Sequence, residues 1–160
     1  MSLAALMALA ACGADVGADR NLLIGAWAQE GVTQTDPALV VEDAVVAYAP
    51  DGTSTFEAVM TFTQHTGVPE RFAIRAGVDW TLEETVLIRT LREVAITPDI
   101  STPEGEALAR ALEDAYRNSP PGRLIVEELT EERLSVLDAD TGTTLSYRRR
   151  TGQEAGVGDG

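Results

Sequence analysis

The chain has 160 residues and a formal net charge of −14. All 12 basic residues are arginine, which excludes Schiff-base chemistry through a lysine side chain. Nucleic acid is not expected as a partner, because phosphate binding needs clustered positive charge. A chain of this length forms one domain of ordinary size, and its single cysteine allows no internal disulfide.

The N-terminus carries the most informative motif. An uncharged apolar run at residues 3–11 has the length of a signal-peptide core and is too short to span a bilayer. Leu9-Ala10-Ala11-Cys12 resembles the lipobox of bacterial lipoproteins. The resemblance implies that residues 1–11 are a signal peptide and that lipid on Cys12 anchors the protein in the cell envelope, at the outer membrane facing the periplasm. An ordinary signal peptide with a chance cysteine is the alternative.

Composition divides the rest of the chain into three parts. Residues 12–21 are small and polar, which is typical of a flexible tether. Residues 151–160 are rich in glycine, so we expect a disordered tail. Residues 22–150 carry the apolar patterning and should form the folded domain.

Residues 22–63 predict three strands, 22–30, 40–49 and 53–63. Pro50-Asp51-Gly52 predicts a turn between the last two, because proline presets φ and glycine tolerates positive φ. These two strands should therefore pair as a hairpin. Residues 53–63 alternate at period two. The apolar face of this strand consists of Phe56, Ala58, Met60 and Phe62.

The alternation resumes after Pro69 and continues to residue 82. One face carries Phe72, Ile74, Ala76, Val78, Trp80 and Leu82. Residues 85–97 are also rich in β-formers, but their phase is broken. Val86, Ile88, Val94 and Ile96 share one face, whereas Leu87 and Leu91 interrupt the pattern. We expect a bulge or a partial cover of the outer face there.

One helix is predicted after these strands. Thr102 suits the N-cap and Pro103 the first helical position, and Ser119-Pro120-Pro121-Gly122 ends the helix. Three short strands follow, at 124–129, 134–138 and 143–150. About eight strands joined mostly by tight turns predict a mainly β protein, an antiparallel barrel or sandwich, with one helix before the last three strands.

Three short motifs resemble the lipocalin-like β-barrels of the calycin group. They are Gly25-Ala26-Trp27 in the first strand, Asp51-Gly52 in the hairpin and Tyr147-Arg148-Arg149 in the last strand. The resemblance spans residues 22–150 and implies a barrel with Trp27 at its closed end. Arg149 shares a face with Leu145 and Tyr147, so Arg149 rather than Arg148 should lie over the indole as a cation–π pair.

Residues typical of catalysis or metal binding are few. The only histidine, His65, lies in a polar loop and should be solvated. No serine lies in a Gly-x-Ser-x-Gly elbow, and a histidine-based metal site would need further ligands of that kind. We therefore expect no catalytic residue, no metal site and no cofactor.

The sequence favours a non-catalytic binding module that holds a small apolar ligand in its barrel. The inward side chains expected to line the ligand site are Phe56, Met60, Phe72, Ile74 and Trp80. The alternative is a partner-binding protein with a filled core, such as a hydrolase inhibitor or an envelope assembly factor. An enzyme that uses carboxylates at the barrel mouth is the third option. A void of a few hundred Å³ would favour the ligand-binding module.

Overall fold

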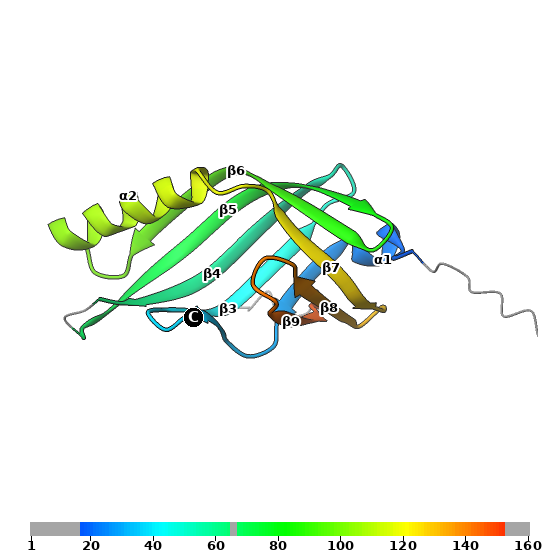
Figure 1. Ribbon diagram of the computed structural model, residues 1–160, viewed down its shortest axis with the longest axis horizontal. Coiled ribbons are helices and arrows are strands. Elements are labelled where there is room, and N and C mark those ends of the chain that lie inside the picture. The colour runs from blue at the N-terminus through cyan, green and yellow to red at the C-terminus, as the bar shows by residue number, and fades with distance from the viewer. Residues whose placement is uncertain (1–16, 65–66, 153–160) are drawn as a thin grey trace, which may run out of the picture.

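A computed structural model describes residues 17–64 and 67–152. It contains nine antiparallel strands and two helices (Figure 1). In chain order these are α1 (Arg20–Leu23), β1 (Gly25–Gln29), β2 (Thr33–Asp36), β3 (Leu39–Tyr48), β4 (Thr53–Thr63), β5 (Pro69–Glu83), β6 (Val86–Pro98), α2 (Pro103–Arg117), β7 (Gly122–Leu129), β8 (Arg133–Asp138) and β9 (Thr144–Arg149).

Eight of these strands close a barrel. The sheet runs in the order β1-β9-β8-β7-β6-β5-β4-β3, and β3 pairs back with β1. The ninth strand, β2, pairs with β3 along Leu39–Val41, beyond the segment Val45–Tyr48 that pairs with β1. The predicted mainly β barrel of about eight strands is confirmed, and so is the position of the long helix before the last three strands.

The barrel has a closed half and an extended half. Strands β4, β5 and β6 have 11, 15 and 13 residues, whereas β1, β8 and β9 have five or six. The three long strands therefore run past the short ones, toward α2 (Figure 1). The apolar side chains of α2 pack there against the inward face of the long strands. A second apolar cluster, around Trp27 and Trp80, fills the closed half.

Residues 18–23 belong to the folded domain, which corrects the predicted tether at 12–21 and the predicted strand at 22–30. The Ala18 N–H donates to the Glu84 carbonyl at 2.9 Å. Asp19 caps α1, which holds Leu23 fully buried, and the strand begins only at Gly25. Apolar burial of Leu23 outweighs the polar composition around it. Residues 12–16 of the predicted tether, Cys12 among them, and the tail from residue 153 lie outside the described residues.

A bulge in β6 explains the broken phase of its sequence. Gly77 lies opposite Glu93 and Val78 opposite Leu91, so Arg92 is the extra residue. One extra residue moves every later side chain to the other face. Leu87 rather than Val86 or Ile88 is therefore fully buried, whereas Val94 and Ile96 face inward as expected. The bulge itself is confirmed, and the prediction that Val86 and Ile88 share a face with Val94 and Ile96 is wrong.

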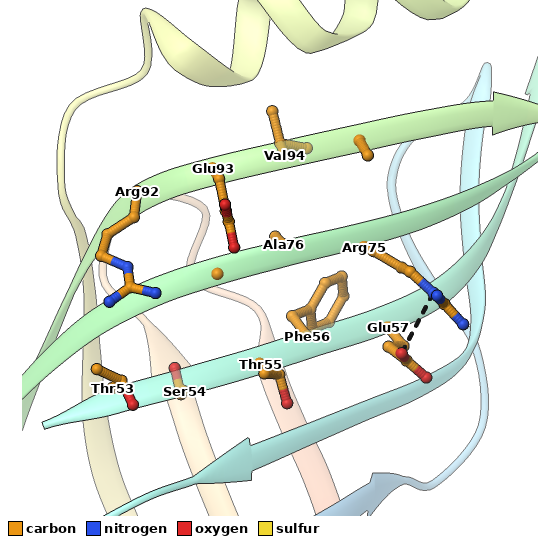
Figure 2. Close-up of a pocket in the computed structure, with 12 residues that line it drawn as sticks. Thr53, Ser54, Thr55, Phe56, Glu57, Arg75, Ala76, Arg92, Glu93 and Val94 are labelled. Carbon is orange, nitrogen blue, oxygen red and sulfur yellow. Dashed lines mark ion pairs between the residues drawn. The ribbon is translucent and has the colours of Figure 1, made fainter. Parts of the chain in front are cut away.

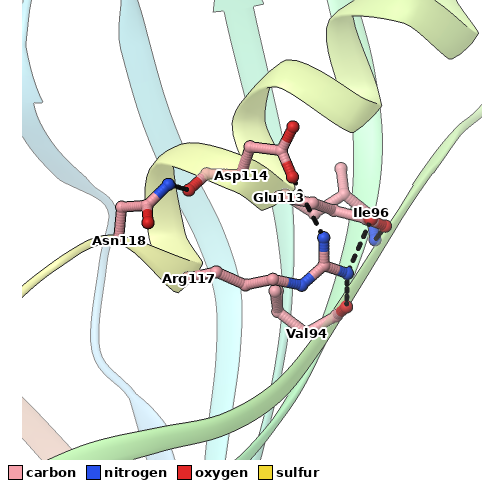
Figure 3. A network of polar contacts seen from close by, with 6 residues as sticks. All are labelled: Val94, Ile96, Glu113, Asp114, Arg117 and Asn118. Atoms are coloured by element: carbon pink, nitrogen blue, oxygen red, sulfur yellow. Dashed lines mark hydrogen bonds and ion pairs between the residues drawn. The ribbon is translucent and has the colours of Figure 1, made fainter.

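Helix α2 covers an open edge of β6. Strand β7 pairs with β6 only along Val86–Arg89, so the later part of β6 has no strand on that side. The Ile96 N–H instead donates to Glu113 Oε1 at 2.8 Å, and Arg117 Nη2 donates to the Val94 carbonyl at 3.4 Å (Figure 3). Arg117 also pairs with Glu113 at 3.0 Å. Two helix side chains thus form hydrogen bonds with backbone groups that would otherwise be unpaired at the edge of the sheet.

Candidate functional site

The closed end of the barrel is built on Trp27. Its ring is fully buried, and its Nε1 donates to the Leu23 carbonyl at 2.8 Å. The guanidinium carbon of Arg149 lies 4.2 Å from the ring centroid. The structure therefore brings these two predicted side chains together. Arg148 is exposed and pairs with Glu30 instead.

Arg149 also joins the last strand to the segment before β1. Its Nη1 donates to the Ile24 carbonyl at 2.7 Å, its Nη2 to the Leu22 carbonyl, and its Nε to the Glu131 carbonyl at 2.5 Å. Gly25 makes room for this arrangement. Its φ is +127°, and a Cβ placed there would lie 2.5 Å from Arg149 Nη1. These contacts are structural, and they close this end of the barrel.

A hollow of about 320 Å³ lies over the outer face of the sheet, and four of its twelve lining residues are charged (Figure 2). It opens over Gly77, where a Cβ would lie 2.9 Å from the Glu93 side chain. Arg75 pairs with Glu57 at 3.3 Å, and both side chains are well exposed. Exposed and mutually paired charges of this kind are typical of a solvated surface.

On the inward face of the barrel lies a half-open cavity of about 240 Å³. It is surrounded by strands β3 to β6 and by α2. Its lining consists of Val41, Phe56, Met60, Ile74, Ala76, Val78, Arg89, Leu91, Val94 and Tyr116. Eight of these ten side chains are apolar, and Arg89 is the only charged one. A mainly apolar cavity with a few polar groups is the usual form of a small-molecule site.

Three of the five predicted lining residues, Phe56, Met60 and Ile74, border this cavity. Phe72 and Trp80 do not, which corrects the prediction for these two. Phe72 is fully buried in the cluster beneath α2. Trp80 is fixed in the closed half, where its Nε1 donates to the Thr53 carbonyl at 2.8 Å and Arg20 lies 4.2 Å above its ring. Both side chains face inward, but close packing of the core leaves no space beside them.

The residue that the sequence analysis missed is Arg89. It lies on β6 between Leu87 and Leu91, and its guanidinium carbon is 5.9 Å from the Phe56 ring centroid. Its Nε is buried and has no hydrogen-bond partner in the structure as described. The signal was the spacing Leu87-x-Arg89-x-Leu91, which places a charge on the apolar face of a strand.

Two tyrosines lie close to Arg89. Burial raises the pKa of Tyr147 to about 12, with a further upward contribution from Tyr48, and the charge of Arg89 opposes this rise. Burial likewise raises the pKa of Tyr48 against the effect of Arg89. Both phenols are therefore neutral at pH 7, and neither supplies a negative charge to Arg89.

A third hollow, of about 480 Å³, lies at the far end of the long strands. Its rim includes Val68 and Ile100, which are 63% and 76% exposed, together with Pro69 and Pro98. In residues 17–64 and 67–152, no group of three or more metal-ligating side chains is present. No helix there is long and apolar enough to cross a membrane. His65 lies outside these residues.

Comparisons with known proteins add two distant structural neighbours. No protein-family model matches the sequence, and no curated protein matches it. A lipocalin-like protein from Bacteroides uniformis is 16% identical, with a TM-score of 0.45 over 81% of this chain and 99% of that one. An uncharacterized protein from Bacteroides eggerthii is also 16% identical, with a TM-score of 0.43 over 80% of this chain and 99% of that one. The barrel described above rests on the strand pairing of this chain.

Proposed function

We propose that this protein is a non-catalytic binding module that holds a small, mainly apolar ligand inside its barrel. The observation that supports this function is the interior cavity of about 240 Å³. A water molecule takes up about 30 Å³, and we assign the same volume to each non-hydrogen atom of a ligand. The cavity therefore has room for a ligand of about eight non-hydrogen atoms, with a longer one reaching toward its opening.

The lining explains why the space is apolar and why it exists. Large side chains such as Phe56 and Met60 stand beside the small Ala76, so the wall is recessed at that position. The apolar part of this wall favours an apolar molecule over water. Tyr116 of α2 completes the wall where the short strands of the barrel do not reach.

The test is calorimetric titration with 1-octanol, which has nine non-hydrogen atoms. Ala76→Leu adds three carbon atoms to the wall, which removes about 90 Å³ of space at about 30 Å³ per atom. We expect octanol binding to weaken at least tenfold in this variant. Ala73→Leu is the matched control, because Ala73 is exposed on the opposite face of the same strand. Equal octanol affinity in both variants, or no binding to the unaltered protein, would refute the proposed function.

We also propose that lipid on Cys12 anchors the protein in the bacterial envelope, at the outer membrane facing the periplasm. The lipobox-like sequence supports this, and the net charge of −14 would repel anionic headgroups, so the anchor has no electrostatic substitute. Cys12→Ala should move the protein from the membrane fraction to the soluble fraction. A variant that stays with the membrane after a salt wash would show that Cys12 is not the anchor.

The second candidate function is the binding of a protein partner, as by a hydrolase inhibitor or an envelope assembly factor. The exposed apolar side chains Val68 and Ile100 favour it, because large solvent-exposed apolar groups gathered at one hollow mark interaction sites. This candidate leads if the unaltered protein binds no octanol. Photo-crosslinking in cells from position 100, compared with the outward position 73, would then test for the partner.

A further inference from the structure

The interior cavity contains a positive charge that the protein leaves without a counterion. Arg89 forms no salt bridge within the described chain, and its buried Nε lacks a hydrogen-bond partner. Removing a guanidinium from water costs free energy unless it is paired and hydrogen-bonded. Arg89 as a whole is only partly buried, so this cost falls on its buried Nε, and the guanidinium is well placed to bind an anion.

The surroundings of Arg89 do not remove this charge. Its sheet neighbours are Trp80 on β5 and Gly122 on β7, and neither is ionisable. The phenols of Tyr48 and Tyr147 are neutral, as shown above. The face of Phe56 lies within reach of a weak cation–π contact, which attracts the charge without neutralising it. The barrel thus offers a partly buried cation beside mainly apolar side chains, although the whole chain has a net charge of −14.

The remainder of the cavity accepts an alkyl chain. Beyond Arg89, the lining is apolar except for the Tyr116 hydroxyl, which lies 3.9 Å from Met60 Sδ. A guanidinium binds carboxylate or phosphate oxygens through two parallel N–H groups. A ligand that satisfies both parts has one anionic head and a short apolar tail.

We propose that the barrel binds a medium-chain amphiphile whose single anionic head, a carboxylate or a phosphate, pairs with Arg89. This inference rests on the proposed function, because it places the head of the ligand within the same cavity. The tail extends between Ile74, Ala76 and Val94, and the cavity volume suits about eight non-hydrogen atoms at about 30 Å³ each.

Calorimetric titration with four probes that each carry an eight-carbon chain tests the proposal. The probes are octanoate, octyl phosphate, 1-octanol and octyltrimethylammonium. We expect octanoate or octyl phosphate to bind at least tenfold more tightly than octanol, and the ammonium probe to bind most weakly. The stronger of the two anions identifies the head group.

Arg89→Met separates the charge from the shape of the site. This change should abolish the preference for the anion while octanol affinity stays within about threefold. Arg92→Met is the matched control, since it removes the same charge from an exposed side chain at the bulge. Because Arg89→Met breaks no salt bridge and no hydrogen bond among the described residues, the melting temperature of the variant should be equal to or higher than that of the unaltered protein. If Arg89→Met does not fold, the Arg89 Nε–H resonance of the unaltered protein serves instead, and it should shift with octanoate but not with octanol.

The outcomes distinguish the two proposals. If octanol binds but octanoate binds no more tightly, the anionic head group is refuted and the apolar binding function stands. If Arg89→Met keeps the preference for octanoate, Arg89 is not the anion site. If none of the four probes binds, the proposed function itself fails.

Discussion

Replacing Arg149 with alanine should loosen the closed end of the barrel more than any other single change of a charged residue there. The side chain stacks on Trp27 and donates three hydrogen bonds to the carbonyls of Leu22, Ile24 and Glu131. These contacts connect the entry to β1 with the turn between β7 and β8. No other residue in the closed end makes the same connection among the contacts described.

The magnitude follows from the contacts. A hydrogen bond from a charged donor contributes about 1.5–3 kcal/mol, and stacking on the indole adds roughly 0.5–2 kcal/mol. A simple sum would approach the whole stability of an ordinary domain. Arg149 is only half-buried, so water replaces part of each bond in the variant. We therefore expect a loss of about 3 kcal/mol.

Urea unfolding followed by circular dichroism measures this loss. With a slope of about 2 kcal/mol per M, the midpoint should fall by about 1.5 M. Arg148→Ala is the control, because Arg148 is 69% exposed and its ion pair with Glu30 is worth at most about 1 kcal/mol. Midpoint shifts of equal size in the two variants would refute the structural role assigned to Arg149.

Three further predictions concern other parts of the molecule. Gly25→Ala should destabilise the domain by about as much as Arg149→Ala, because the new Cβ would contact Arg149 and φ at this position is positive. Urea unfolding checks this, and the double variant should lose much less stability than the sum of the two single losses. Glu113→Ala should speed hydrogen exchange of the Ile96 amide and cost about 1–2 kcal/mol, whereas Glu113→Gln, which keeps an acceptor, should cost less; an unchanged exchange rate would contradict the edge contact. Burial raises the pKa values of all three tyrosines above 10.0. Their contribution to stability is therefore complete below pH 10 and is lost as the pH rises toward 12. Phenolate absorbance should appear only above pH 10 and together with unfolding.

Local patterns in the sequence predicted most of the barrel. The alternation of β4 and β5 identified the inward face, and the Asp51-Gly52 turn identified the hairpin, which the observed pairing of Tyr48 with Ser54 confirms. Thr102 caps α2 as its type and position predict, since its side chain accepts from the Gly105 N–H at 3.0 Å. Each of these features depends on residues close together in the chain.

Features that depend on distant partners were missed. Helix α1 has only four residues, and it is stabilised by burial of Leu23 and by contacts to residues far along the chain. Strand β2 is four residues long and lies beside β3 only because the barrel leaves that edge open. Arg89 was missed because the position of the bulge decides which face of β6 it shares, and alternation alone does not locate a bulge.

The edge contacts of α2 have a consequence for the range of ligands. At the closed end, a change in barrel width would break ladders of strand-to-strand hydrogen bonds. At the level of the cavity, one wall is a helix that the Glu113 and Arg117 side chains connect to β6. A change in the tilt of α2 moves Tyr116 and alters the volume of the cavity without breaking any bond between strands. Under the proposed function, the cavity can therefore adjust to tails of different length while the rest of the barrel keeps its shape.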